Sequence, residues 1–195
     1  MNIKYLQAIV FDLDGTLVDS RLDFDKMRRD LGFPPGVPIL EHLSLQEDEN
    51  YIKKCNQIIC EHEENGVQVA TLMPGVHKLL EIIKIKGLKT GILTRNNSNV
   101  TRLTLEKFKL KFDVVYSRED CRPKPHPEGL LRMAKNWEVK PENMLYIGDF
   151  LFDLETAKNA KAKSCLYLNS KNHELKSQAD YVLESYDILI KSLSL

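Results

Sequence analysis

Short runs of apolar residues recur along the chain without polar residues between them. The first is Ala8–Phe11. Runs of this kind, which lack alternation, are typical of strands that are covered on both faces, as in a parallel sheet. Further strands are predicted at residues 90–94, 114–116, 144–147, 165–168 and 181–183.

Helical periodicity follows most of these runs. Residues 76–86 open after Pro74 and end at Gly87, and a second helical segment begins at Pro127, a residue favoured in the first turn. Alternation of strands with amphipathic helices is typical of α/β proteins. The sequence therefore predicts an α/β fold with a doubly wound, Rossmann-like parallel sheet.

Residues 20–73 interrupt this alternation because they contain no strand-like run. A helix is predicted from Asp23 to Leu31, and Ser44-Leu45-Gln46-Glu47 has the pattern of a capping box that opens a second helix, which ends at Gly66. We expect a core domain of residues 1–19 and 74–195 and a small helical cap domain of residues 20–73. Short hinges near Asp19 and Met73 would let the cap domain move as a lid.

The charge of the chain is balanced, with 28 Lys and Arg against 28 Asp and Glu in 195 residues. A net charge of zero gives no overall attraction to nucleic acid or to an anionic membrane. No apolar run reaches the ~18 residues of a membrane span, and the first residues lack a signal-peptide pattern. We therefore expect no nucleic-acid or membrane partner, and the oligomeric state stays open.

The chain has four cysteines and no CxxC pair. This number is ordinary for a reducing compartment, and we expect all four to be buried thiols. The localisation that follows is cytoplasmic.

Acidic residues gather at the ends of two predicted strands. Asp12 and Asp14 follow the first run, and Asp149 and Asp153 follow the run at 144–147. Open α/β sheets bind ligands at the carboxyl ends of their strands. Two neighbouring carboxylates repel each other unless a cation or a shared proton intervenes, and an oxygen-rich site of this kind suits Mg²⁺. An ordinary turn at Asp14 and a helix-terminus charge at Asp153 are the alternatives.

Two further positions supply donors for a phosphoryl dianion. Thr94 ends its predicted strand with a hydroxyl, and Lys124 stands between Pro123 and Pro125, which stiffen the backbone around it. The alternatives are a helix-capping role for Thr94 and a solvated surface position for Lys124.

In this order and spacing, the motifs resemble those of the haloacid dehalogenase superfamily. The resemblance is to its phosphatase branch with an inserted helical cap domain of the C1 type, similar to phosphoglycolate phosphatases, and it extends from Ile9 to Val182. The residues that match its four motifs are Asp12-Leu13-Asp14-Gly15-Thr16-Leu17, Thr94, Lys124, and Gly148-Asp149 with Asp153.

The resemblance implies a phosphoric monoester hydrolase that works in two steps through an aspartyl-phosphate. Asp12 would attack phosphorus, and Asp14 would act as general acid and then as general base. Mg²⁺ would be held by Asp12, the backbone carbonyl of Asp14, and Asp149. The substrate would be a small phosphorylated metabolite.

The remaining matched residues would support this chemistry. Thr94 and Lys124 would bind phosphoryl oxygens, and backbone N–H groups near Asp14 and Gly15 would assist, with Thr16 in support. Asp153 would orient Lys124 or a metal-bound water. Candidates for contact with the rest of the substrate are Arg21, Arg95 and Asn96.

Other functions stay open at this point. A dehalogenase of the superfamily would lack the second acidic residue, so Asp14 favours phosphate chemistry. A phosphomutase similar to β-phosphoglucomutase shares all the motifs and differs mainly in its cap domain, while a scaffold protein would keep the fold without catalysis.

Overall fold

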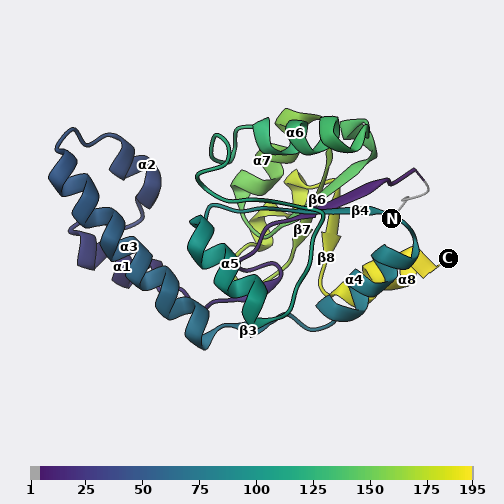
Figure 1. The fold of residues 1–195 in the computed structure, drawn as a ribbon, viewed down its shortest axis with the longest axis horizontal. Coiled ribbons are helices and arrows are strands. Elements are labelled where there is room, and N and C mark those ends of the chain that lie inside the picture. Colours follow the sequence, from purple (N-terminus) through teal and green to yellow (C-terminus); the bar gives the residue numbers. More distant parts are fainter. Residues whose placement is uncertain (1–4, 195) are drawn as a thin grey trace. The chain divides into compact units, whose positions relative to one another are not determined.

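The computed structural model describes residues 5–194. Within them, six parallel strands form one sheet in the order β5-β4-β1-β6-β7-β8 (Figure 1). Each apolar run of the sequence overlaps one of these strands, so the predicted α/β class is confirmed. The strands are β1 (Ala8–Phe11), β4 (Lys89–Leu93), β5 (Val114–Tyr116), β6 (Met144–Gly148), β7 (Lys163–Tyr167) and β8 (Tyr181–Leu183).

Helices cover both faces of the sheet. Ile9 and Phe11 of β1 pack in a core with apolar residues of α4 and α8, whereas Ala8 and Val10 pack on the other face with α6 and α7. Because both faces are covered, β1 is apolar at every position, as its sequence indicated. The helices of this part are α4 (Val76–Ile85), α5 (Ser98–Lys107), α6 (Glu128–Trp137), α7 (Leu151–Ala160) and α8 (Tyr186–Ser194), with short 3-10 helices η1 (Pro141–Asn143) and η2 (His173–Gln178).

The central position of β1 determines where polar groups can meet. Phe11, its last residue, pairs with Ile92 of β4 on one side and with Ile147 of β6 on the other. All three strands run in the same direction, so the segments that follow them emerge at the same edge of the sheet. These segments carry Asp12, Thr94 and Asp149.

The chain divides into two compact units. An α/β unit runs to Asp19 and resumes at Thr71, and a helical unit consists of Ser20–Ala70. The return to the α/β unit at Thr71 is set by a pair of two-residue antiparallel strands, β2 (Val18–Asp19) and β3 (Thr71–Leu72). The sequence analysis missed this pair because two residues are too few to show a periodicity.

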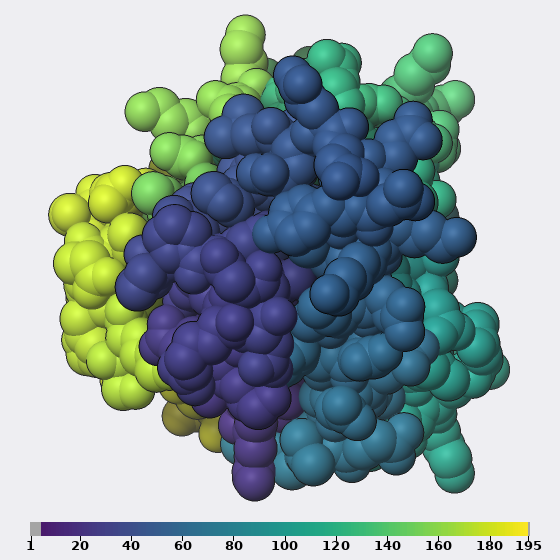
Figure 2. All heavy atoms as spheres, turned by 90° about the vertical axis from the view of Figure 1, so that its left-hand side faces the viewer, coloured from purple at the N-terminus to yellow at the C-terminus, as the bar shows by residue number. Residues whose placement is uncertain are grey.

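The helical unit contains α1 (Phe24–Leu31), α2 (Ile39–Ser44) and α3 (Glu49–Val69). The predicted first helix is confirmed: Asp23 accepts a hydrogen bond from the backbone N–H of Lys26, and Gly32 ends the helix in a left-handed conformation. The surface of this unit is purple and blue in Figure 2. Its own apolar core is made of Met27, Leu31, Phe33, Ile39, Leu43, Cys55 and Ile59.

The predicted limits of the second helix are wrong at both ends. Ser44 ends α2, which the sequence analysis missed, and α3 begins at Glu49 with Asp48 as its N-terminal cap. Gly66 does not end α3 but lies inside it. A Cβ atom at Gly66 would lie 3.0 Å from the Leu22 side chain, so the glycine allows close packing there.

Only two of the four cysteines, Cys55 and Cys165, are buried, and Cys60 and Cys121 are partly exposed. The expectation of four buried thiols is therefore wrong. Among the described helices, none has the length and apolar character that crossing a membrane requires.

Candidate active site

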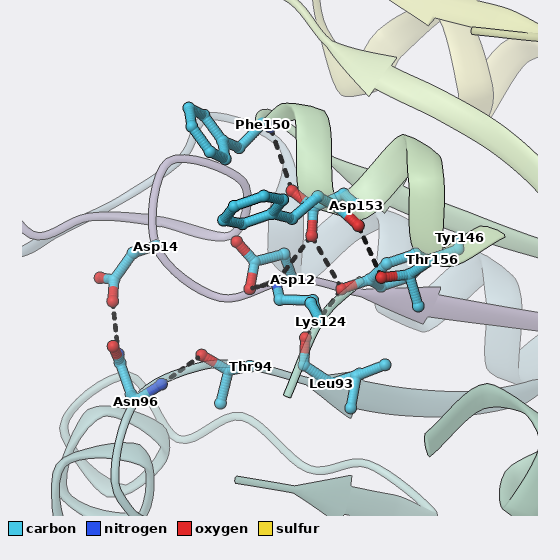
Figure 3. A network of polar contacts seen from close by, with 11 residues as sticks. Asp12, Asp14, Leu93, Thr94, Asn96, Lys124, Tyr146, Phe150, Asp153 and Thr156 are labelled. Carbon is cyan, nitrogen blue, oxygen red and sulfur yellow. Dashed lines mark hydrogen bonds and ion pairs between the residues drawn. The ribbon is translucent and has the colours of Figure 1, made fainter. Parts of the chain in front are cut away.

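Asp12 is held at the carboxyl end of β1. Its backbone N–H donates to the carbonyl of Ile147 at 2.8 Å, which continues the pairing with β6 by one residue. The residue is only 8% exposed, and Oδ1 of its carboxylate accepts a hydrogen bond from Nζ of Lys124 at 2.7 Å (Figure 3). A buried carboxylate is thus paired with a buried ammonium.

Lys124 is not a surface residue, because its side chain is buried between two carboxylates. Nζ lies 2.7 Å from Oδ1 of Asp12 and 2.6 Å from Oδ1 of Asp153. Burial acts to lower the pKa of Lys124, but the two carboxylates outweigh it and raise the pKa above its ordinary value. The ammonium therefore stays charged at neutral pH.

Asp153 has two tasks, one for each carboxylate oxygen. Oδ2 accepts a hydrogen bond from the backbone N–H of Phe150 at 3.0 Å, at the start of α7, and Oδ1 accepts from Lys124. The hydroxyl of Tyr146 also lies 2.9 Å from Oδ1. Asp153 therefore both caps a helix and contacts Lys124. The sequence analysis missed Tyr146, because a tyrosine within an apolar run looks like a core residue.

Gly148 makes room for this arrangement. A Cβ atom at this position would lie 2.2 Å from Cγ of Asp153, closer than packed atoms can approach. Glycine at the end of β6 is thus required by the folded position of the aspartate five residues later.

Asp12, Asp149 and Asp153 form an acidic cluster in which one carboxylate oxygen from each residue lies within 4.8 Å of the others. Burial raises the pKa of Asp149 to about 8, and the charges of Asp12 and Asp153 add to this effect. Burial also raises the pKa of Asp12 to about 7 against the attraction of Lys124. When all three carboxylates are ionised, one ammonium leaves two negative charges unbalanced. A divalent cation with a preference for oxygen ligands, such as Mg²⁺, fits this donor set.

Asp14 points away from that cluster toward the segment after β4. Its carboxylate accepts a hydrogen bond from the side-chain amide of Asn96 (Figure 3). The backbone N–H of Asn96 donates to the hydroxyl oxygen of Thr94 at 3.2 Å. Asn97 caps α5, so Thr94 has no part in capping that helix. The structure thus brings together Asp14, Thr94 and Asn96.

Gly15 and Thr16 form the turn beneath the site. Gly15 has a φ of 75°, and its N–H donates to the carbonyl of Val18 at 2.7 Å. We expected this N–H to bind a phosphoryl group, but it is already engaged within the turn. A Cβ at Gly15 would also lie 2.3 Å from Oδ2 of Asp149. Thr16 is buried, and its carbonyl accepts a hydrogen bond from the Tyr186 hydroxyl at 2.8 Å.

The two arginines expected to contact the substrate lie in different units. The guanidinium of Arg95 stands 4.8 Å from the ring centroid of Phe152, which in turn packs edge-to-face on the exposed Phe150. Arg21 belongs to the helical unit, where its backbone has a φ of 53°. Arg95 therefore rests on the first turn of α7.

Two asparagines after β7 complete the surroundings of Asp149, and the sequence analysis missed both. Asn169 donates to Oδ2 of Asp149 at 3.0 Å, and Asn172 donates to its backbone carbonyl at 2.7 Å. They could have been predicted, because they are polar residues that follow a buried strand. The same pattern indicated Asp12 after β1 and Asp149 after β6.

Comparisons with known proteins identify the family of the chain. The haloacid dehalogenase-like hydrolase family matches residues 23–167. A haloacid dehalogenase-like hydrolase domain-containing protein of Arabidopsis thaliana is 31% identical over 83% of this chain and 70% of its own length. A phosphoglycolate phosphatase of Nitrosococcus oceani is 29% identical, with 98% of this chain and 97% of the relative covered. A phosphorylated carbohydrates phosphatase of Thermotoga maritima is 31% identical, with 80% and 82% covered.

A solved structure shares the fold. The crystal structure of a hydrolase from Pseudomonas syringae matches with a TM-score of 0.81 and 22% identity, covering 96% of this chain and 98% of that one. The expected enzyme class, a phosphoric monoester hydrolase, agrees with the phosphatase names of the relatives. With the family match over residues 23–167, the resemblance seen in the sequence is confirmed, and the chain belongs to the haloacid dehalogenase-like hydrolases.

Proposed function

We propose that the chain is a Mg²⁺-dependent phosphatase that hydrolyses a small phosphorylated metabolite through an aspartyl-phosphate on Asp12. The observation that carries this proposal is the buried contact of Asp12 with Lys124, 2.7 Å long, inside a cluster with Asp149 and Asp153. An ordinary surface turn would not bury two carboxylates, Asp12 and Asp153, around one ammonium beside the partly buried Asp149, because their desolvation is costly. In a site that binds a cation and a phosphoryl group, the same buried charges have a function that explains their desolvation.

Asp12, Asp149 and the backbone carbonyl of Asp14 are the proposed metal ligands. Bound there, Mg²⁺ supplies positive charge that keeps the carboxylates ionised and lets a phosphoryl dianion approach them. The raised pKa values of Asp12 and Asp149, about 7 and about 8, support this assignment, since burial, with a smaller contribution from neighbouring carboxylates, disfavours the ionised forms that a bound cation would stabilise.

The reaction divides into two displacements at phosphorus. In the first, a carboxylate oxygen of Asp12 bonds to phosphorus, the bond to the leaving oxygen breaks, and Asp14 gives that oxygen a proton. In the second, water attacks phosphorus, Asp14 takes its proton, and the bond to Asp12 breaks to release phosphate. The hydrogen bond from Asn96 orients the Asp14 carboxyl for both proton transfers.

Thr94 and Lys124 are the proposed donors to the phosphoryl oxygens. The Thr94 oxygen accepts from the backbone N–H of Asn96, so its own O–H is left to donate. Lys124 is positioned by Asp153 at 2.6 Å, which fixes its ammonium beside the nucleophile. Fixed donors of this kind stabilise charge as it develops in the transition state.

The substrate class is proposed from the relatives and from the two arginines. The names of the relatives specify phosphoglycolate and phosphorylated carbohydrates, which are small phosphorylated metabolites. We assign the helical unit the role of a cap domain that selects the leaving group, with Arg21 on that unit and Arg95 on the α/β unit as candidate contacts. An arginine can hold an anionic leaving group through two parallel hydrogen bonds.

A panel of phosphorylated metabolites, scored by release of inorganic phosphate, tests this function. The proposal predicts release from at least one small phosphomonoester with Mg²⁺ and none with EDTA. Sugar monophosphates are supplied with and without a sugar bisphosphate, and isomerisation in place of phosphate release would contradict hydrolysis. Failure of every phosphomonoester at millimolar concentration would overturn the catalytic assignment altogether.

A further inference from the structure

The loop after β7 contacts Asp149 through both of its asparagines. Nδ2 of Asn169 donates to the carboxylate oxygen Oδ2 at 3.0 Å, and Nδ2 of Asn172 donates to the backbone carbonyl at 2.7 Å. Asn172 is only 4% exposed. The same aspartate is thus held by its side chain and by its main chain, from one short loop.

The hydrogen bonds fix which way each amide points. Oδ1 of Asn169 accepts from the backbone N–H of Lys171 at 2.8 Å, and because an N–H can only donate, the amide nitrogen must face Asp149. Oδ1 of Asn172 likewise accepts from the backbone N–H of Asn169 at 2.9 Å. Its Nδ2 also donates to the carbonyl of Tyr167 at 3.0 Å. Asn172 therefore anchors the backbone from which Asn169 reaches the carboxylate.

The Asp149 carboxylate is confined from a second direction. The oxygen that accepts from Asn169, Oδ2, also lies against Gly15, where a Cβ would come within 2.3 Å of it. Gly15 belongs to the segment after β1, and Asn169 to the segment after β7. The Asp149 carboxylate is therefore held between these two segments. The side-chain amide of Asn169 is neutral, so it fixes the carboxylate without adding charge to the acidic cluster.

We propose that Asn169 is a positioning residue that orients Asp149 toward the divalent cation, with Asn172 as the anchor of its loop. This inference rests on the proposed function, since it assumes that Asp149 is a metal ligand. Residues that hydrogen-bond to a ligand typically contribute 10- to 100-fold to metal affinity. Neither asparagine belongs to the four motifs that identify the family.

The test is a titration of the metal-free full chain with Mg²⁺ alone. Binding is monitored by calorimetry and by the shift of the thermal unfolding midpoint. For Asn169→Ala we expect a dissociation constant for Mg²⁺ that is about 10- to 100-fold higher than in the wild type. Its unfolding midpoint without metal should stay close to that of the wild type. Asn143→Ala is the matched control, because it also removes a hydrogen bond donated by an asparagine side chain. Asn143 lies just before β6, and its Nδ2 donates to Oε1 of Gln7 at 2.8 Å. This variant should leave the Mg²⁺ affinity unchanged.

Asn172→Ala separates positioning from simple loop stability. It leaves the carbonyls of Asp149 and Tyr167 without their donor, so we expect a lower unfolding midpoint without metal together with weaker Mg²⁺ binding. Suppose that the wild type binds Mg²⁺ and releases phosphate. If Asn169→Ala then binds Mg²⁺ as tightly as the wild type, only the positioning role of Asn169 is overturned. If the wild type neither binds Mg²⁺ nor releases phosphate from any ester, this inference and the proposed function both fail.

Discussion

The ammonium of Lys124 lies 2.7 Å from Oδ1 of Asp12, although 112 positions separate the two residues in the chain. One comes directly after β1 and the other precedes α6, and both belong to the α/β unit. This contact, with Asp153 on the other side of the ammonium, gives the first prediction.

Replacing Lys124 with methionine should lower kcat by about 100- to 1,000-fold, because a charged donor to the phosphoryl group is lost. It should also destabilise the metal-free protein, since two buried carboxylates would then face each other without a counter-charge. Steady-state kinetics and urea unfolding measure the two effects. Lys135→Met, at an exposed position of α6, is the control. Unchanged kcat in Lys124→Met would show that this ammonium takes no part in the reaction.

Gly148→Ala should destabilise the fold by about 1–3 kcal/mol, the usual cost of forcing an extra group into a packed site. The new Cβ would lie 2.2 Å from Cγ of Asp153, so the aspartate must move and Lys124 must lose a partner. Activity should fall together with stability. Gly36→Ala is the comparison, since nothing lies within 4 Å of that position and only its backbone preference changes. A fully active, stable Gly148→Ala variant would contradict the close packing of Asp153.

The metal-free protein should lose stability as pH rises. The pKa values of Asp12 and Asp149 in the folded protein, about 7 and about 8, lie above their ordinary value of 3.8. Between these limits the folded state binds protons that the unfolded state has released, so the free energy of unfolding falls from about pH 4 to about pH 8.

Urea unfolding in EDTA at about pH 5 and about pH 8 measures this slope. The Asp149→Asn variant should have a smaller slope than the wild type, because it lacks one of the two groups. Mg²⁺ should restore stability, most strongly at the higher pH, since binding then has fewer protons to displace. Equal slopes in the wild type and in Asp149→Asn would show that Asp149 does not carry the effect.

Turnover should depend on the choice of cation. EDTA should abolish phosphate release and Mg²⁺ should restore it, while Ca²⁺ should be a poor substitute, because its looser coordination misplaces Asp12. The measurement is phosphate release from an activated aryl phosphate after metal removal and addition of each cation in turn. Restoration by Zn²⁺ alone would contradict a site of oxygen ligands.

Features that depend on a short stretch of sequence could be predicted, and features that depend on distant residues could not. The buried strands and the polar residues directly after them, such as Asp12 and Asp149, could be predicted because period and position are properties of a short stretch of chain. The helix start at Asp48 could not be separated from a similar pattern at Ser44, since both have good capping residues. Gly66 was misread because its partner, Leu22, lies far away in the sequence.

The side-chain contacts around the acidic cluster were less accessible. The role of Tyr146 depends on a hydrogen bond from β6 to Asp153 in α7, and its position in an apolar run does not differ from that of a core tyrosine. Asn169 follows a buried strand, as Asp12 and Asp149 do, but its contact with Asp149 joins the segments after β7 and β6 and is visible only in the fold. The position of Asp14 beside Asn96, away from Asp149, is likewise a tertiary property. The motifs identified the acidic residues, while only the fold shows which oxygen faces which donor.

The most direct measurement is the transfer of a phosphoryl group to Asp12. An activated aryl phosphate needs no acid to leave, so Asp14→Asn should form the aspartyl-phosphate but lack the base that helps water release it. Mass spectrometry of the quenched protein should then locate phosphate on Asp12 in Asp14→Asn and none in Asp12→Asn. Asp12→Asn should fold normally and keep less than about one hundredth of wild-type turnover. Higher residual turnover, or turnover without any phosphate on Asp12, would contradict the covalent mechanism.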